Sequence, residues 1–446
     1  MRRVCLITLS TILLGLSAAA PASADRVFGV DGAAAPGPAR YDRVRVIEQG
    51  PRKARKVLVL VPGTSAGAAS FRPVARAIVR ALPGWKVWSV DRRENLLEDH
   101  SVADRVLAGS RPPADMFRYY LQWLTDPSVA PRFTPVASAD YARRWGMGVA
   151  VRDLRNVIRA ARRGGRTVVL GGHSLGATIT VAYATWDFGG RAGARDLSGL
   201  LLVDGGSGRD PLSHAEARSR LEQLDAGSPF IDLTGLGLPW SAGVFNLVGS
   251  TLARLAPDEP SPLHDWPALP ADLKAPVRTT NAGGYGYALD AETSPESLQL
   301  VHVNIGGLAP AGDPRAWADG ELGTVAHTAA LFSGIEGIDG TAWYHPVRLS
   351  LDGGAVAAGI RNPAQKLLGV RTTHGRDLDL PIYAFETSLG GGRVLAGARA
   401  LAKQSGIERL TLVDRSATYD HVDPLAALPD RNAFVKTVVP FLRRIM

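Results

Sequence analysis

The chain has 446 residues, with 51 lysines and arginines against 42 acidic residues, a formal net charge of +9 and a single cysteine. This length exceeds what one hydrophobic core usually serves, so we expect one large domain with insertions or two domains. The sequence contains no module in which aromatic and basic side chains alternate as in nucleic-acid-binding proteins, so we expect no nucleic-acid partner.

The first 24 residues have the pattern of a secretory signal peptide. A basic start at Arg2 and Arg3 precedes an apolar stretch at 4–16 and the small-residue cleavage sequence ASA, which ends at Ala24. The apolar stretch is too short to cross a bilayer as a stable helix. We therefore expect a secreted protein that is cut after Ala24 and has no integral membrane segment. Because Cys5 lies in the removed part, the mature chain would hold no disulfide and no thiolate metal ligand.

Apolar strands alternate with helices in the first half of the chain. Strands that are buried on both faces of a parallel sheet have continuous apolar sequences, as these do. The alternation predicts an α/β fold with a mostly parallel sheet that is flanked by helices. The expected strands are 44–48, 56–61, 86–90, 167–170 and 200–203, and the expected helices are 71–82, 153–163 and 177–185.

The middle of the chain has a different character. Residues 207–378 are rich in glycine, proline, tryptophan and tyrosine and show only short periodic pieces, so we interpret them as a cap or lid insertion. A smaller irregular insertion is expected at 93–147. The core then comprises 25–206 and 379–446, with late strands at 381–385 and 408–413 and late helices at 391–405 and 432–444.

The pentapeptide from Gly172 to Gly176 lies between an expected strand and an expected helix and has Ser174 at its centre. This G-x-S-x-G arrangement is typical of a sharp turn that exposes a serine hydroxyl. A serine hydroxyl is a weak nucleophile until it is held beside a base. The two glycines have no Cβ, so the backbone can turn sharply and neighbouring segments can approach. We predict that Ser174 is a nucleophile; the alternative is a tight turn with a structural role only.

Acyl transfer by a serine needs a base within reach of the hydroxyl and an acid that orients the base. At this kind of turn the three residues follow in the chain order serine, acid, histidine. His421 fits the base, because it lies on a loop after the last expected strand. His173, inside the turn, is expected to point away from the serine hydroxyl and to have a packing role.

Two carboxylates compete as the acid. Glu386 follows the strand at 381–385 and Asp204 follows the strand at 200–203, so both lie at the carboxyl ends of strands, where ligands bind in open parallel sheets. We place Glu386 first and Asp204 second. Asp420 and Asp423 are further candidates.

A tetrahedral intermediate also needs hydrogen-bond donors for its oxyanion. One is expected from the N–H of Leu175, directly after the nucleophile, and another from the loop after the strand at 56–61. In that loop Gly63 allows close approach of the backbone, and Thr64 can present its N–H. Thr64 is therefore the expected second donor, with Ser65 next.

Taken together, the turn GGHSLGA, the loop VPGTS, the strand end YAFETS and the loop DHVDPL resemble the α/β-hydrolase superfamily. The stretch VPGT also resembles the oxyanion loop of some fungal lipases, in which Gly-Thr has this role. The resemblance covers about residues 41–206 and 379–446. It implies an eight-stranded, mostly parallel sheet and serine-ester chemistry, with a cap where the long middle segment lies. The chain departs from the superfamily in lacking a clear G-x-x-D after the strand at 381–385.

These features predict a secreted serine hydrolase, of the esterase or lipase type, that cleaves carboxylic esters through an acyl-enzyme. The aromatic residues of the middle segment suit an apolar cap over an enclosed site for a small or lipid-like ester. The same triad could instead transfer the acyl group to another acceptor or cleave an amide. A non-catalytic protein that binds a ligand with its cap is the alternative from another class. The sequence has no HExxH, no Cys/His metal pattern and no P-loop, so we expect no metal and no cofactor.

Overall fold

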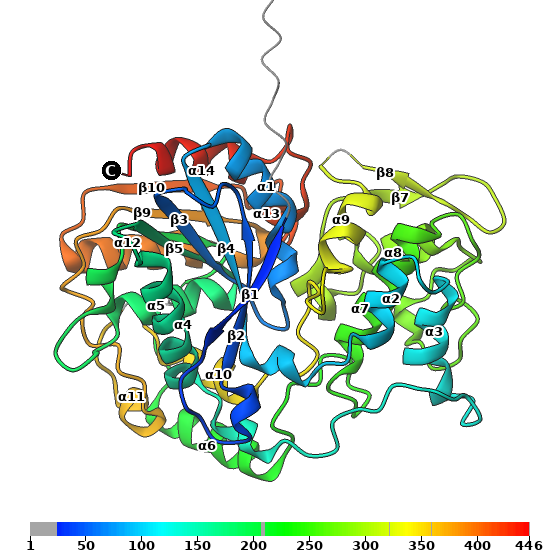
Figure 1. The fold of residues 1–446 in the computed structure, drawn as a ribbon, viewed down its shortest axis with the longest axis horizontal. Helices are drawn as coiled ribbons and strands as arrows, with labels where there is room; N and C mark the ends of the chain where they lie inside the picture. The colour runs from blue at the N-terminus through cyan, green and yellow to red at the C-terminus, as the bar shows by residue number, and fades with distance from the viewer. Residues whose placement is uncertain (1–24, 207–209, 321, 358, 446) are drawn as a thin grey trace, which may run out of the picture.

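The computed structural model describes residues 25–206, 210–320, 322–357 and 359–445 (Figure 1). The expected signal peptide lies outside these residues. One sheet of eight strands forms the centre, in the order β1-β2-β4-β3-β5-β6-β9-β10. The strands are β1 (Arg26–Asp31), β2 (Arg43–Gln49), β3 (Lys56–Val61), β4 (Trp85–Asp91), β5 (Thr167–His173), β6 (Gly199–Val203), β9 (Ile382–Glu386) and β10 (Leu410–Asp414).

Strand β2 alone runs against the other seven, because it pairs antiparallel with both β1 and β4 while all other neighbours pair in parallel. This arrangement confirms the expected eight-stranded, mostly parallel sheet. The sequence analysis missed β1, an edge strand in which no residue is buried. Its side chains therefore do not form the continuous apolar run by which the inner strands were recognised.

Helices cover both faces of the sheet, and the side chains of β3 show why. Val57 and Val59 point into one hydrophobic cluster with the helices α4 (Met147–Arg162), α5 (Leu175–Thr185) and α12 (Arg393–Ser405). Leu58 and Leu60 point into a second cluster with α1 (Arg72–Ala81) and α14 (Ala433–Arg443). Because successive residues of a strand face opposite sides, a run of apolar residues fills both clusters at once. The result is a sandwich of three layers.

The segment between β6 and β9 divides into two parts. Three of its helices, α6 (His214–Ala226), α10 (Val347–Gly353) and α11 (Pro363–Leu368), pack near α4 and α5 and add side chains to the first cluster. The others lie beside the sheet, on the right of Figure 1. These elements are α7 (Ser241–Leu255), α8 (Asn281–Leu289), α9 (Val325–Phe332) and the hairpin of β7 (Gly306–Leu308) and β8 (Trp317–Asp319). The described part of this segment thus packs partly on the helices of the sheet and partly beside the sheet, and we call the second part the cap.

The smaller insertion joins this cap. Its helices α2 (Ser101–Leu107) and α3 (Ala114–Tyr120) pack on the same side, where α3 contacts α7. An aromatic cluster holds the two insertions together, with Tyr120 and Phe133 from one against Trp240 and Trp343 from the other. None of the described helices is long and apolar enough to span a bilayer.

Candidate active site

Ser174 lies at the turn between β5 and α5, as the sequence predicts. Its backbone has φ 56° and ψ −128°, a conformation that side-chain-bearing residues rarely adopt and that is typical of functional positions. Both flanking glycines are needed at this turn. A Cβ on Gly172 would lie 2.1 Å from the carbonyl carbon of Gly176, and one on Gly176 would lie 1.9 Å from the carbonyl oxygen of Val61. The pentapeptide thus forms a sharp elbow with a half-buried serine at its tip.

One cavity of about 50 Å³ is lined by Ser174, His421 and Thr64. The three come from the ends of different core elements: Ser174 follows β5, Thr64 follows β3, and His421 lies between β10 and α13 (Asp423–Ala426). The insertion contributes further wall residues, such as Asn246 of α7 and Phe332 of α9. In the part of the chain that the structure describes, no hydrogen bond joins Ser174 to His421; such bonds often form only in the substrate complex.

Asp204 is the carboxylate that contacts His421. Its Oδ2 lies 2.5 Å from Nδ1 of the imidazole, and its Oδ1 accepts the N–H of Thr387 at 2.8 Å. The Thr387 hydroxyl also donates to Oδ2. Burial acts to raise the pKa of Asp204, but the hydrogen bond and charge of His421 and the hydrogen bonds from Thr387 hold it below its ordinary value. The carboxylate is therefore charged at neutral pH and fixed on both oxygens.

Glu386 has a different environment, although it ends the neighbouring strand. Its two oxygens accept the N–H groups of Val394 and Leu395, each at 3.2 Å, at the beginning of α12. A carboxylate at this place satisfies N–H groups that have no partner within the helix and interacts favourably with the helix dipole. The sequence analysis placed Glu386 first and Asp204 second, but in the structure Asp204 contacts His421, whereas Glu386 is turned toward a helix.

A glycine next to Asp204 distinguishes the two acids in the sequence. A Cβ on Gly205 would lie 2.1 Å from the carbonyl oxygen of Ser174, so the end of β6 passes directly against the elbow. Asp204 itself has a positive φ of 43°. The sequence Asp-Gly-Gly therefore marks a backbone that approaches Ser174 closely, whereas Glu386 is followed by Thr387 and a short 3-10 helix, Ser388–Gly390.

His173 and two acidic residues hold the loop of the base in place. The Nε2 of His173 donates to the carbonyl of His421 at 2.8 Å. Burial, together with the neighbouring His421, lowers the pKa of His173 to about 3, so this imidazole is neutral. Asp423 accepts the N–H groups of Asn304 at 2.9 Å and of Asp420 at 2.7 Å. Asp420 and Asp423 thus hold the loop in place. The carboxylate that contacts the His421 imidazole is that of Asp204.

The loop after β3 contains Thr64, whose N–H has no hydrogen-bond partner among the described residues. Ser65, the other candidate donor, uses its N–H in a bond of 3.2 Å to Nδ1 of His345. The N–H of Leu175 begins α5, where the first N–H groups have no partner within the helix. The two expected oxyanion donors therefore both lie near Ser174, Leu175 as the next residue of the chain and Thr64 in the wall of the same cavity.

Two buried residues that the sequence analysis missed fix this loop. Arg92 donates to the carbonyls of Pro62 at 2.5 Å and Gly63 at 2.9 Å. Burial, with the neighbouring Arg92, lowers the pKa of His345 well below its ordinary value. Because neutral His345 accepts from Ser65 at Nδ1, its proton lies on Nε2, 3.0 Å from the Ser350 hydroxyl. His345 belongs to the insertion and lies 280 positions after Ser65 in the chain, so no local sequence pattern indicates this contact.

One group of side chains could hold a metal ion, namely Glu98, His100 and Asp339, whose ligand atoms lie within 4.8 Å of one another. Burial and the charge of Asp339 raise the pKa of Glu98 well above its ordinary value. Asp339 also accepts the indole N–H of Trp343 at 2.9 Å. None of the three lines the cavity of Ser174.

A scan against protein-family models found no match, and neither did a sequence search of curated proteins. Similar solved structures include a proposed lipase from Sulfolobus solfataricus, with a TM-score of 0.49, 15% identity and 94% of each chain covered. A thermophilic esterase from Thermogutta terrifontis has a TM-score of 0.42 and 13% identity, with 94% of this chain and 99% of that chain covered. An epoxide hydrolase from an endophytic Streptomyces has a TM-score of 0.43 and 14% identity, with 94% of this chain and 95% of that chain covered.

The fold is recognised from the order of the strands and from the positions of Ser174 and His421 along the chain. The eight-stranded sheet with β2 alone reversed, the serine elbow directly after β5 and the histidine loop after the last strand form one consistent arrangement. In this arrangement the serine of the elbow, the buried carboxylate and the histidine that contacts this carboxylate follow in the chain order Ser174, Asp204 and His421. The chain has the α/β-hydrolase fold.

Proposed function

We propose that the protein is a serine hydrolase that cleaves carboxylic esters through an acyl-enzyme, with Ser174 as nucleophile, His421 as base and Asp204 as acid. The observation that supports this most is the shared cavity of Ser174 and His421, with the far side of the imidazole held 2.5 Å from Asp204. A strained serine beside a base that is oriented by a buried carboxylate is the arrangement that acyl transfer requires. The N-terminal sequence pattern supports secretion of this enzyme.

The reaction follows from the tautomer of His421. A proton on Nδ1, shared with Asp204, leaves Nε2 as the basic nitrogen. Nε2 accepts the proton of the Ser174 hydroxyl while Oγ attacks the ester carbonyl, and the N–H groups of Leu175 and Thr64 donate to the oxyanion. His421 then gives the proton to the departing alcohol. Water, activated by the same Nε2, attacks the acyl-enzyme and releases the acid.

Hydrolysis of p-nitrophenyl butanoate by wild type and by Ser174→Ala tests this proposal. Replacing a serine nucleophile lowers kcat by about 10⁶, so the variant should show only background hydrolysis. Ser110→Ala is the matched control, because Ser110 is exposed and lies away from the cavity, and it should keep wild-type activity. Retained hydrolysis by folded Ser174→Ala would disprove the proposal. Assays with added alcohol, amine and peroxide separate hydrolysis from transfer to other acceptors.

A further inference from the structure

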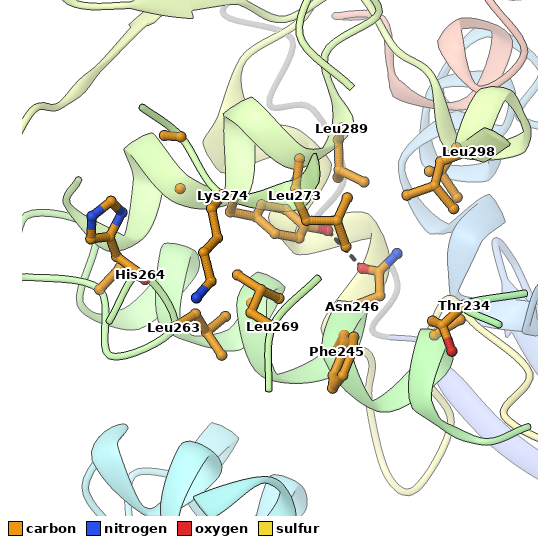
Figure 2. A pocket seen from close by; sticks show the side chains of 18 of the residues that line it. Thr234, Phe245, Asn246, Leu263, His264, Leu269, Leu273, Lys274, Leu289 and Leu298 are labelled. Carbon is orange, nitrogen blue, oxygen red and sulfur yellow. Dashed lines mark hydrogen bonds between the residues drawn. The ribbon is translucent and has the colours of Figure 1, made fainter. Parts of the chain in front are cut away.

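A second, larger cavity lies within the insertion, with a volume of about 130 Å³. Its walls come from α7, α8 and the segments at 261–275 and 297–301, and they are mostly aliphatic (Figure 2). Leucine is the most frequent wall residue, as at Leu252, Leu263, Leu269 and Leu273. Such a lining binds hydrocarbon, since water inside it would find few hydrogen-bond partners.

The two cavities share three wall residues, Asn246, Leu300 and Val301. The two cavities therefore adjoin at these three residues. A chain attached to an ester carbonyl at Ser174 could pass between these residues and continue into the insertion. The cavity of Ser174 alone, at about 50 Å³, has room for only a short substituent.

A smaller number of polar side chains also lines the aliphatic cavity. Near one end the amide oxygen of Asn246 accepts the hydroxyl of Tyr285 at 2.8 Å, which fixes this side chain where the cavities meet (Figure 2). His264 and Lys274 lie toward the other end, away from Leu298 (Figure 2). Between them a chain would contact almost only aliphatic and aromatic carbon.

We propose that this cavity binds a long aliphatic chain of the substrate ester, so that the enzyme prefers lipid-like esters over short ones. The inference rests on the proposed function, because it places the ester carbonyl at Ser174. Burial of one methylene stabilises a complex enough to change its affinity about fourfold. The value of kcat/KM should therefore rise by up to about fourfold for each added methylene until the cavity is full.

Either the acyl group or the alcohol of an ester can carry such a chain. Two series of substrates show which of the two parts enters the cavity. In p-nitrophenyl esters from butanoate to hexadecanoate only the acyl chain grows. In alkyl acetates from butyl to dodecyl only the alcohol grows. A rise of kcat/KM with chain length in one series supports the proposal and identifies the part that enters the cavity. Equal values along both series overturn it.

A substitution that fills the aliphatic cavity tests the same proposal from the side of the protein. Ala288 is a half-buried wall residue on α8, and Ala288→Phe places a ring in the path of the chain. The ratio of kcat/KM for the long ester to that for the butanoate should fall by at least tenfold. Ala226→Phe, at the exposed end of α6, introduces the same side chain away from both cavities and should keep the wild-type ratio. An unchanged ratio in a folded Ala288→Phe protein overturns the proposal.

A binding measurement separates failure of this inference from failure of the proposed function. Calorimetric titration of Ser174→Ala with dodecanoate should show saturable binding, and titration with butanoate should show much weaker binding. Binding that is lost in Ala288→Phe supports the cavity even if no ester is hydrolysed. Ester hydrolysis without chain-length preference and without dodecanoate binding leaves the proposed function intact and overturns the inference. If Ala288→Phe does not fold, Ala242→Phe in another wall, on α7, replaces it.

Discussion

The imidazole of His421 and the carboxylate of Asp204 lie 2.5 Å apart, joining a loop after the last strand to the end of β6. Thr387, the residue directly after β9, donates its N–H to the same carboxylate at 2.8 Å. The side chain of Asp204 is thus held by the residue after β9 and by the loop after β10, and it fixes the direction of the imidazole. Glu386, adjacent to Thr387 in the chain, faces the other way and binds the beginning of α12.

We expect Asp204→Asn to lower kcat by about 10⁴, because the amide would favour the wrong tautomer of His421 while the geometry stays nearly unchanged. Glu386→Gln is the matched control and should alter kcat by less than tenfold. Steady-state kinetics with p-nitrophenyl butanoate measures both. The assignment of the acid fails if Glu386→Gln has the larger effect on kcat.

The role of Glu386 should appear in stability. Glu386→Ala leaves two buried N–H groups at the beginning of α12 without their acceptor and removes a charge that interacts with the helix dipole. The free energy of unfolding should fall by about 1–3 kcal/mol, measured by urea denaturation. An exposed carboxylate such as Glu222 on α6 provides the comparison, and Glu222→Ala should change stability by less than 0.5 kcal/mol, a rough bound for surface sites. Equal effects of the two substitutions would contradict this role.

His345 should act on the oxyanion loop through Ser65. His345→Ala removes the acceptor of the Ser65 N–H and lets the loop with Thr64 shift. Small displacements of catalytic groups cost up to about 10² in rate, so kcat should fall while KM changes little. His345→Gln can still accept a hydrogen bond and should recover part of kcat. A change in KM alone would show that His345 affects binding and not the loop.

The same histidine should contribute to the pH dependence of stability. Because the folded-state pKa of His345 lies well below 6.5, the unfolded chain takes up a proton on this side chain below that pH and the folded chain does not. Its contribution to stability is present above about pH 6.5 and falls by up to about 1.4 kcal/mol for each unit below it. Burial raises the pKa of Asp352 and of Asp423 to about 6, which acts in the opposite direction between about pH 4 and 6.

The informative quantity is therefore a difference between two proteins. Urea denaturation of wild type and His345→Gln at pH 7.5 and pH 5.5 isolates the histidine, since both proteins share the two aspartates. Wild type should lose more stability than the variant on acidification. Identical losses would show that His345 is not held neutral by the fold.

The inner strands and the elbow could be predicted because their determinants are local. Residues 56–61 form β3 with the predicted bounds, and Ser174 occupies the predicted turn. The choice between Asp204 and Glu386 depends on contacts with segments distant in the sequence, because both acids lie at the ends of adjacent strands. Asp204 contacts His421, whereas Glu386 accepts N–H groups at the beginning of α12. Arg92 and His345 had no pattern of their own, because their partners lie on a loop far away in the sequence.

Reaction with a fluorophosphonate probe, followed by mass spectrometry of the intact protein and of its peptides, tests the central claim most directly. The probe forms a stable bond only with a serine whose hydroxyl is activated by a base. The account predicts one adduct per chain, on Ser174, absent in Ser174→Ala and formed much more slowly in Asp204→Asn. Folded wild-type protein that takes up no probe, or takes it up on another serine, would contradict it.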